Sequence, residues 1–146
     1  MRSEKGFTLA EMLVVLVLLT ILCTAVAPSL YRNWQQATMD FAIQQLHRDL
    51  RWAQWEAGSK QKKMTVTFYR DRQPYRYVIR YAGQPLNLRY RTLPGSLDKL
   101  EAQTIIIETD KRFQKNGHVL LQKGDCKRYV YYYQTGRSRV TKKATG

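Results

Sequence analysis

The stretch GFTLAEMLVVLVLLTILCTAVAP, from Gly6 to Pro28, decides the fold of this chain. From Phe7 to Leu30 the only ionised side chain is that of Glu11, and most of the other residues are apolar. Such a stretch is long enough to cross a bilayer as a helix, which needs about 20 apolar residues. A carboxylate within a membrane helix is costly, so its presence predicts a functional role for Glu11.

Two ordinary explanations of this segment leave Glu11 unexplained. Residues 25–27, Ala-Val-Ala, have the small-x-small pattern of a signal-peptide cleavage site, but Pro28 would follow the cut directly. A plain single-pass anchor gives no reason for the carboxylate. Arg2 and Lys5 precede the apolar run, which favours a cytoplasmic N-terminus by the positive-inside rule.

A third explanation comes from the order of residues around the start of the run. A charged leader, Met1–Gly6, ends in glycine, and Phe7 follows it. Counted from Phe7, Glu11 is the fifth residue and Pro28 the twenty-second. This order resembles the prepilin-type N-terminus of type IV pilins and type II secretion pseudopilins. The resemblance implies that a prepilin peptidase cuts between Gly6 and Phe7 and that the new amine of Phe7 is N-methylated.

The same resemblance implies a role for Glu11 in filament assembly. Pilin helices pack in a staggered bundle, so Glu11 of one subunit can meet the Phe7 amine of a neighbour. A buried charge is tolerated when it is paired and penalised when it is not, so this pair would select the register of the subunits. Pro28 removes a helix hydrogen bond and predicts a kink.

The chain beyond Pro28 continues as a second, amphipathic helical segment over residues 31–57. Its apolar residues recur at steps of three and four, which is the spacing of one helix face. Gly58-Ser59-Lys60 is expected to end the helix. The residues of the predicted stripe are Met39, Ile43, Leu46, Leu50, Ala53 and Ala57.

After Lys63 the apolar residues alternate with a period of two, which predicts strands. Met64–Tyr69 and Tyr75–Tyr81 flank a turn around Pro74 and are expected to form a hairpin. Residues 92–100 are expected to be a loop. The other predicted strands are Leu86–Arg91, Thr104–Glu108, His118–Gln122 and Tyr129–Gln134, with Asn116-Gly117 joining the second and third of these.

These segments predict an α+β, pilin-like fold, in which a long N-terminal helix packs on an antiparallel β-sheet domain. The first half of the helix is expected to be transmembrane, with the kink at Pro28. The predicted divisions are residues 1–6 (removed leader), 7–30 (transmembrane and filament-core helix), 31–57 (amphipathic helix) and 58–146 (sheet domain).

The C-terminal half carries a second resemblance, based on layout. Phe113–Gly117 followed by Val119, and then a strand ending in Thr135-Gly136-Arg137, is similar to the C-terminal layout of H-type minor pseudopilins. The strings AIQQLHRDLRWAQWEA and KKMTVTFYRD are similar to the ComGD type of competence minor pseudopilin, from the DNA-uptake apparatus of Gram-positive bacteria.

The chain is strongly basic, with 25 Lys and Arg against 11 Asp and Glu and a formal net charge of +14. This balance favours anionic partners such as nucleic acid, acidic pilin surfaces or wall polymers. Several cations alternate with tyrosines in predicted strands, which suits contact with phosphates and stacking on bases. A solvated face whose tyrosines pack on the other side fits the same pattern. The candidate DNA or partner contacts are Arg76, Arg80, Arg89, Arg91, Lys127 and Arg128.

No catalytic or metal-binding constellation is predicted. His47 and His118 lack the neighbouring ligands that a metal site needs. Cys23 and Cys126 form no CxxC motif, and no glycine-rich phosphate loop is present. We therefore expect a protein that is not an enzyme and that needs no metal and no cofactor.

The resulting functional hypothesis is a minor pseudopilin of a competence type IV pilus, located at or near the filament tip and supporting uptake of extracellular DNA. Its expected partners are the prepilin peptidase, other minor and major pilins, the membrane as a single-pass protein, and DNA as a further candidate. The C-terminal domain is expected outside the cell membrane and, after assembly, in a surface pilus. Two alternatives remain: a minor pseudopilin of a type II secretion system, and a tip receptor that binds DNA directly through Arg and Tyr rows.

Overall fold

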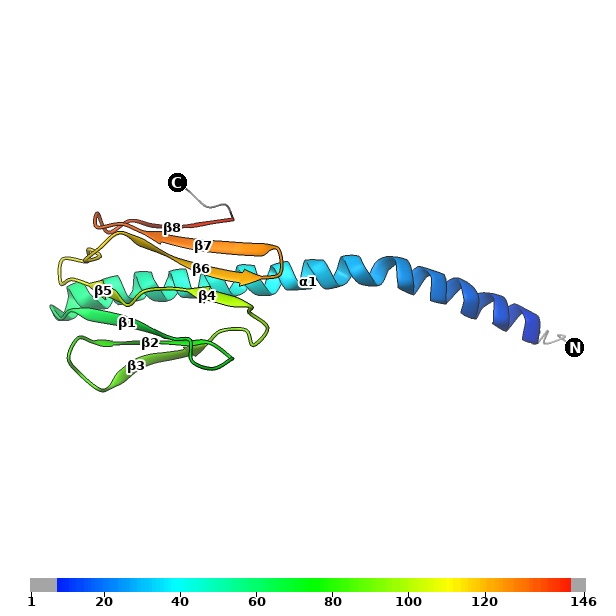
Figure 1. Ribbon diagram of the computed structural model, residues 1–146, viewed down its shortest axis with the longest axis horizontal. Helices are drawn as coiled ribbons and strands as arrows, with labels where there is room; N and C mark the ends of the chain where they lie inside the picture. Colours follow the sequence, from blue (N-terminus) through cyan, green and yellow to red (C-terminus); the bar gives the residue numbers. More distant parts are fainter. Residues whose placement is uncertain (1–7, 143–146) are drawn as a thin grey trace, which may run out of the picture. The chain divides into compact units, whose positions relative to one another are not determined.

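The computed structural model describes residues 8–142, which fall into two compact units divided between Gln35 and Gln36. The helix α1 (Leu9–Lys60) contributes to both units, and every strand belongs to the second. Figure 1 shows the order of these elements along the chain. The expected α+β architecture, a long N-terminal helix with antiparallel sheets, is confirmed.

The first turn of α1 is capped by Thr8. The backbone N–H of Glu11 donates to the Thr8 carbonyl at 3.1 Å and to the Thr8 hydroxyl oxygen at 3.3 Å. A threonine three residues before a glutamate is the sequence pattern of a capping box, and an acidic side chain in the first turn interacts favourably with the helix dipole. Glu11 therefore also stabilises the N-terminal end of the helix.

The helix α1 ends within the predicted stretch Gly58-Ser59-Lys60, a little beyond the predicted segment bound at Ala57. Gly58 lies within the last turn, and the helix ends at Lys60. Gln61 adopts a left-handed conformation (φ 53°), and the N–H of Lys62 donates to the carbonyl of Ala57 at 3.2 Å, as in a Schellman cap. Gly58 leaves room for the Lys111 side chain: a Cβ there would lie 2.2 Å from Cε of Lys111, so this flexible side chain would have to move.

Over the described residues, eight strands form two four-stranded antiparallel sheets, and not the single sheet that the alternation suggested. The first sheet has the order β3-β2-β1-β5 and the second β4-β6-β7-β8. The strands of the first sheet are β1 (Met64–Tyr69), β2 (Arg76–Tyr81), β3 (Asn87–Thr92) and β5 (Ile105–Ile107). Those of the second are β4 (Lys99–Glu101), β6 (Gly117–Lys123), β7 (Cys126–Tyr132) and β8 (Ser138–Thr141).

The predicted β1–β2 hairpin is confirmed, with Val66 opposite Ile79. Two other expectations were wrong. Residues 92–100 are not all loop, because β4 begins at Lys99, and β5 and β6 belong to different sheets and do not pair through Asn116-Gly117. Strand β8 was not predicted. Strands β4 and β8 are short edge strands, and they offer too few residues for a period of two to be recognised.

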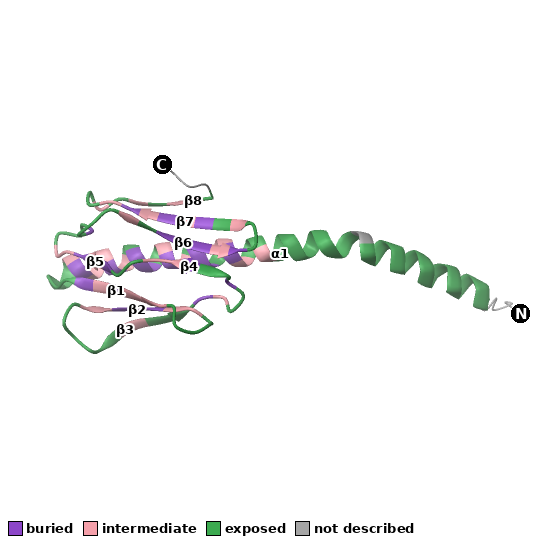
Figure 2. Cartoon of the chain, in the orientation of Figure 1, coloured by how far each residue is buried: buried purple, intermediate pink, exposed green. Residues whose placement is uncertain are grey.

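The core of the second unit lies between the α1 stripe and the two sheets, as the purple positions in Figure 2 show. All six residues of the predicted stripe, from Met39 to Ala57, are fully buried. They meet the inward-facing residues of both sheets, for example Val66 and Ile79 of the first and Val119 and Val130 of the second. One helix face therefore serves two sheets.

Candidate functional site

From Leu9 to Leu30 the exposed side chains of α1 are mostly apolar. An 18-residue window of α1 has a mean hydropathy of 2.6 and is not covered by any other part of the described chain. By length and composition this is the one described helix that could cross a membrane. The hydroxyls of Thr20 and Thr24 donate to the carbonyls of Leu16 and Ile21 at 2.8 and 2.9 Å, which satisfies them without water.

Glu11 lies at the start of this apolar surface, as the sequence predicted. Among the described residues its carboxylate makes no ion pair. The helix runs on through Pro28, so the expected kink stays a prediction. Gly6 and Phe7, the residues of the predicted cleavage, lie outside the described residues. An apolar helix that carries one unpaired carboxylate near its start suits burial among other apolar helices that supply a cation.

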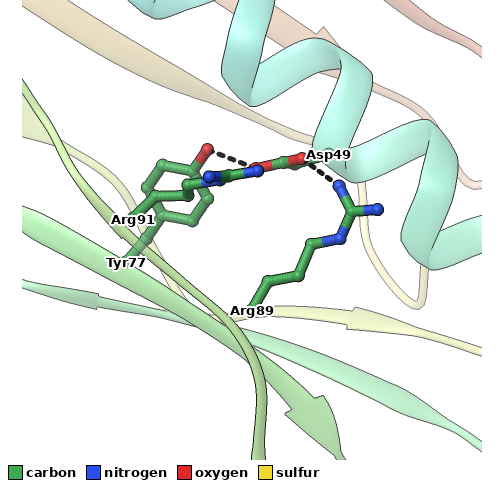
Figure 3. Close-up of polar contacts among 4 residues, drawn as sticks. All are labelled: Asp49, Tyr77, Arg89 and Arg91. Atoms are coloured by element: carbon green, nitrogen blue, oxygen red, sulfur yellow. Dashed lines mark hydrogen bonds and ion pairs between the residues drawn. The ribbon is translucent and has the colours of Figure 1, made fainter.

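The first sheet is tied to α1 by a cluster centred on Asp49, drawn in Figure 3. The carboxylate is only 3% exposed. The Tyr77 hydroxyl donates to its Oδ2 at 2.8 Å, Nη1 of Arg89 lies 2.6 Å from Oδ1, and Nε of Arg91 lies 3.3 Å from Oδ2. Burial, and next the charge of Asp49, raise the pKa of Tyr77 well above its ordinary value. The phenol therefore stays protonated and serves as a permanent donor.

Strand register explains why the two arginines reach Asp49. Tyr77 of β2 stands opposite Arg91 of β3, and Ile79 stands opposite Arg89. Residues opposite each other in an antiparallel pair point to the same face, and Tyr77 and Ile79 face the helix. Arg89 also stacks its guanidinium 3.9 Å from the ring centre of Trp52, on the next turn of α1.

The second sheet is tied to α1 by Asp40. Nε of the buried Arg128 donates to its Oδ1, and Nζ of Lys142 lies 3.9 Å from Oδ2. The Arg128 hydrogen bond is the main cause that holds the pKa of Asp40 below its ordinary value. The same bond raises the pKa of the Arg128 guanidinium. Arg128 is thus a tether between strand β7 and the helix.

The six cations predicted to contact DNA or a partner do not share a face. Arg89, Arg91 and Arg128 point to α1 and are bound to carboxylates. Arg76 and Arg80 lie on the opposite face of the first sheet, since their β1 partners are Tyr69 and Thr65. Lys127 lies on the outer face of the second sheet, opposite Gln122. Contact of these residues with DNA stays a prediction.

Sequence reasoning missed a different group of cations. Arg51 on α1 and Arg137 and Arg139 after β7 line one hollow of about 810 Å³ in the second unit. In the sequence, Thr135-Gly136-Arg137 stands out only as part of the C-terminal layout that is similar to H-type minor pseudopilins. Arg51 is 86 positions before Arg137 in the chain (137 − 51), so no local pattern could have joined them. Among the described residues, no group of three or more His, Cys, Asp or Glu side chains could hold a metal.

The exposed apolar helix surface and the two antiparallel sheets give the chain a pilin-like α+β fold. Comparison with known families agrees: residues 1–27 match the prokaryotic N-terminal methylation motif. The matched range includes Gly6, Phe7 and Glu11, the residues of the predicted processing and assembly sites.

A particular relative is also found. Over 79 residues the chain is 35% identical to competence protein ComGD of Bacillus subtilis (strain 168), in an alignment that covers 54% of each chain. The chain thus spans about half the length of the curated relative that it matches. No solved structure matches the chain. Together, the motif and this relative support the interpretation of the chain as a type IV pilin-like pseudopilin of the ComGD type.

Proposed function

We propose that this protein is a minor pseudopilin of a competence type IV pilus, that it assembles at or near the filament tip, and that it supports uptake of extracellular DNA. One observation carries the proposal: a membrane-length apolar helix surface that no other described part of the chain covers, together with an N-terminal methylation motif. The competence context rests on similarity to a protein named competence protein ComGD.

The proposed mechanism is assembly. Cleavage between Gly6 and Phe7 creates an amine, and Glu11 of one subunit pairs with that amine of a neighbour as the apolar helices leave the lipid for the filament. In low-dielectric surroundings an unpaired charge is strongly penalised, so only the register that joins the two is stable. The second unit, which folds around its own core, is then free to contact partner pilins.

The function is tested by deleting the coding sequence in the source bacterium and measuring transformation with purified DNA. We expect transformation to be lost and to return when the wild-type chain is supplied in trans. Normal transformation of the deletion strain would reject the competence function. Secretion of exoproteins is measured in the same strains, because a type II secretion pseudopilin would affect secretion and leave transformation intact.

A further inference from the structure

A groove in the second unit collects positive charge from three separate parts of the chain. Its larger part is the hollow of about 810 Å³ already described, lined by Arg51, Arg137 and Arg139. A smaller hollow of about 350 Å³ shares Arg51, Gln54, Thr135 and Gly136 with it and continues to Trp55, Lys111 and Arg112. We refer to these two adjoining hollows as the basic groove.

The lining of the basic groove carries more positive than negative charge. Its lining residues include five Arg and Lys side chains and a single carboxylate, that of Asp110. Nε of Arg112 lies 3.4 Å from Asp110, so the one carboxylate is already engaged. Among the described residues, Arg51 and Arg137 make no ion pair. Clefts lined by one sign of charge concentrate oppositely charged ligands.

The groove is held in shape by hydrogen bonds in its floor. The side-chain amide of Gln54 donates to the carbonyls of Lys111 and Gly136 at 2.7 and 2.9 Å, joining α1 to two loops. The turn before Arg137 is closed by the N–H of Tyr133 donating to the Arg137 carbonyl at 2.9 Å. Gly136 takes a left-handed conformation (φ 82°) that side chains disfavour. The cations are therefore carried on a fixed frame, which reduces the entropy lost on binding.

Aromatic groups accompany the cations. Trp55 is 60% exposed although it lies on the same helix as the buried stripe, and Tyr133 lines the larger hollow half-buried. A row of cations that follows a phosphate backbone, beside rings on which bases can stack, is the common arrangement of proteins that bind nucleic-acid strands without sequence preference. An acidic protein surface could neutralise the arginines, but it would not need an exposed indole beside them.

From this arrangement we infer that the basic groove binds a nucleic-acid strand, with backbone phosphates at Arg51, Arg137 and Arg139 and a base against Trp55. The inference deepens the proposed role in DNA uptake and rests on it, and it places DNA contact away from the strand residues that the sequence suggested. Three of those six, Arg89, Arg91 and Arg128, face α1 and are already bound to its carboxylates.

The test uses the full chain in nanodiscs of zwitterionic phosphatidylcholine, so that lipid charge does not compete. Fluorescein-labelled oligothymidine and a labelled DNA duplex are the probes, and anisotropy is measured over a series of salt concentrations. The groove variant is Arg51→Ala/Arg137→Ala. The matched control is Arg76→Ala/Arg80→Ala, which removes the same charge from the outer face of the first sheet. Both variants are first checked for the unfolding midpoint of the wild type.

We expect the groove variant to bind oligothymidine at least about tenfold more weakly than the wild type. Its slope of log affinity against log salt should fall by about 1.4, because each lost single-strand phosphate contact removes about 0.7. The control should stay within about twofold of the wild type in affinity. Trp55→Ala should weaken the binding of oligothymidine by about tenfold and the binding of the duplex by much less, because stacking needs an unpaired base.

Three results would overturn the inference: no binding of either probe by the wild type, equal losses in the groove variant and its control, or a groove variant that binds DNA normally. A groove variant that binds DNA normally but fails to enter filaments would mark the groove as a contact for an acidic pilin instead. Failure of the proposed function is separate, because it appears as normal transformation of the deletion strain. If deletion abolishes transformation while the groove variant binds like wild type, only the groove inference fails.

Discussion

The two parts of α1 differ in whether their apolar surface is covered by the rest of the described chain. Before Gln36 the helix is apolar on nearly all sides, and residues such as Leu16 and Leu19 are more than half exposed. After Gln36 it has one apolar stripe, and residues such as Leu46 and Leu50 are fully buried. A stripe can be covered by sheets from the same chain, whereas a helix that is apolar all round needs a membrane or other helices.

One helix therefore carries two separate sources of stability. The second unit is held by its own core and by the Asp49 and Asp40 tethers. Under the proposed function, the first unit instead makes its energetically important contacts with lipid or with other subunits. Substitutions in the first unit should therefore alter assembly and leave the second unit's unfolding unchanged, and substitutions around the tethers should do the reverse.

The largest expected effect follows from Glu11→Val. We expect membrane insertion and Gly6–Phe7 cleavage to persist, because the helix becomes more apolar, and incorporation into filaments to be lost. The measurement is immunoblotting of sheared filament fractions and of membranes. Thr20→Val is the matched control, since it also removes a polar group from the exposed helix, but that group bonds only to the Leu16 carbonyl. Normal recovery of the Glu11 variant in filaments would contradict the pairing mechanism.

The next largest effect is expected from Asp49→Ala in the second unit. Removing this carboxylate leaves Arg89, Arg91 and the buried Tyr77 hydroxyl without their acceptor. Breaking a buried ion pair in this way costs about 3–5 kcal/mol of unfolding free energy. Urea unfolding of the full chain in nanodiscs, followed by tryptophan fluorescence, measures the loss.

The control for Asp49 is Asp110→Ala, which breaks the exposed pair with Arg112 and should cost less than about 1 kcal/mol. Membrane insertion should be normal in both variants. If the Asp49 variant unfolds at the wild-type urea concentration, the cluster in Figure 3 does not tether the first sheet to the helix.

A smaller effect is expected from Gly136→Ala, compared with Gly83→Ala. Both glycines have left-handed φ values, 82° and 78°, so both variants carry the same backbone strain of about 1 kcal/mol. Only Gly136 also has a tertiary neighbour: a Cβ there would lie 3.2 Å from the Lys111 carbonyl oxygen, whereas none lies within 4 Å at Gly83. We therefore expect the Gly136 variant to unfold at lower urea. Equal urea midpoints of the two variants would show that the contact with the Lys111 carbonyl adds no further destabilisation.

The smallest effect is expected from acidification through the titration range of His47. Its Nε2 lies 3.0 Å from the Ser138 hydroxyl oxygen. Burial, the largest cause, and the nearby charge of Arg51 lower its pKa from 6.5, against an opposing effect of Ser138. A lowered pKa in the folded state means that the stabilisation is present above pH 6.5 and is lost as pH falls through the folded value. His47→Gln should weaken this dependence of urea midpoint on pH, and an unchanged profile would contradict it.

The fold could be predicted in its main parts because its signals are local. The apolar run, the α1 stripe and the β1–β2 alternation each lie within a short stretch, where periodicity alone reports which face is buried. The division into two sheets could not be predicted in this way, since β4 pairs with β6 and β1 with β5 across intervening chain. Edge strands of three or four residues give no periodic signal of their own.

The candidate sites differ in the same way: one is marked by its local sequence, and the others only by tertiary contacts. Glu11 was recognisable from sequence because a carboxylate in an apolar run stands out without any knowledge of its neighbours. Arg89 and Arg91 were grouped with Arg76 and Arg80 because alternation with tyrosine looks alike on either face of a strand. Only the register against β2 shows that the first two face Asp49.

The sequence by itself determined that this chain has a membrane-length helix with one carboxylate, a prepilin-type start and a basic, sheet-forming remainder. Those properties depend on the order and type of adjacent residues. Only the tertiary structure decided which cations form ion pairs with Asp49 and Asp40 and which line the basic groove. Charge neutralisation depends on distances between side chains far apart in sequence, and those distances exist only once helix and sheets have packed.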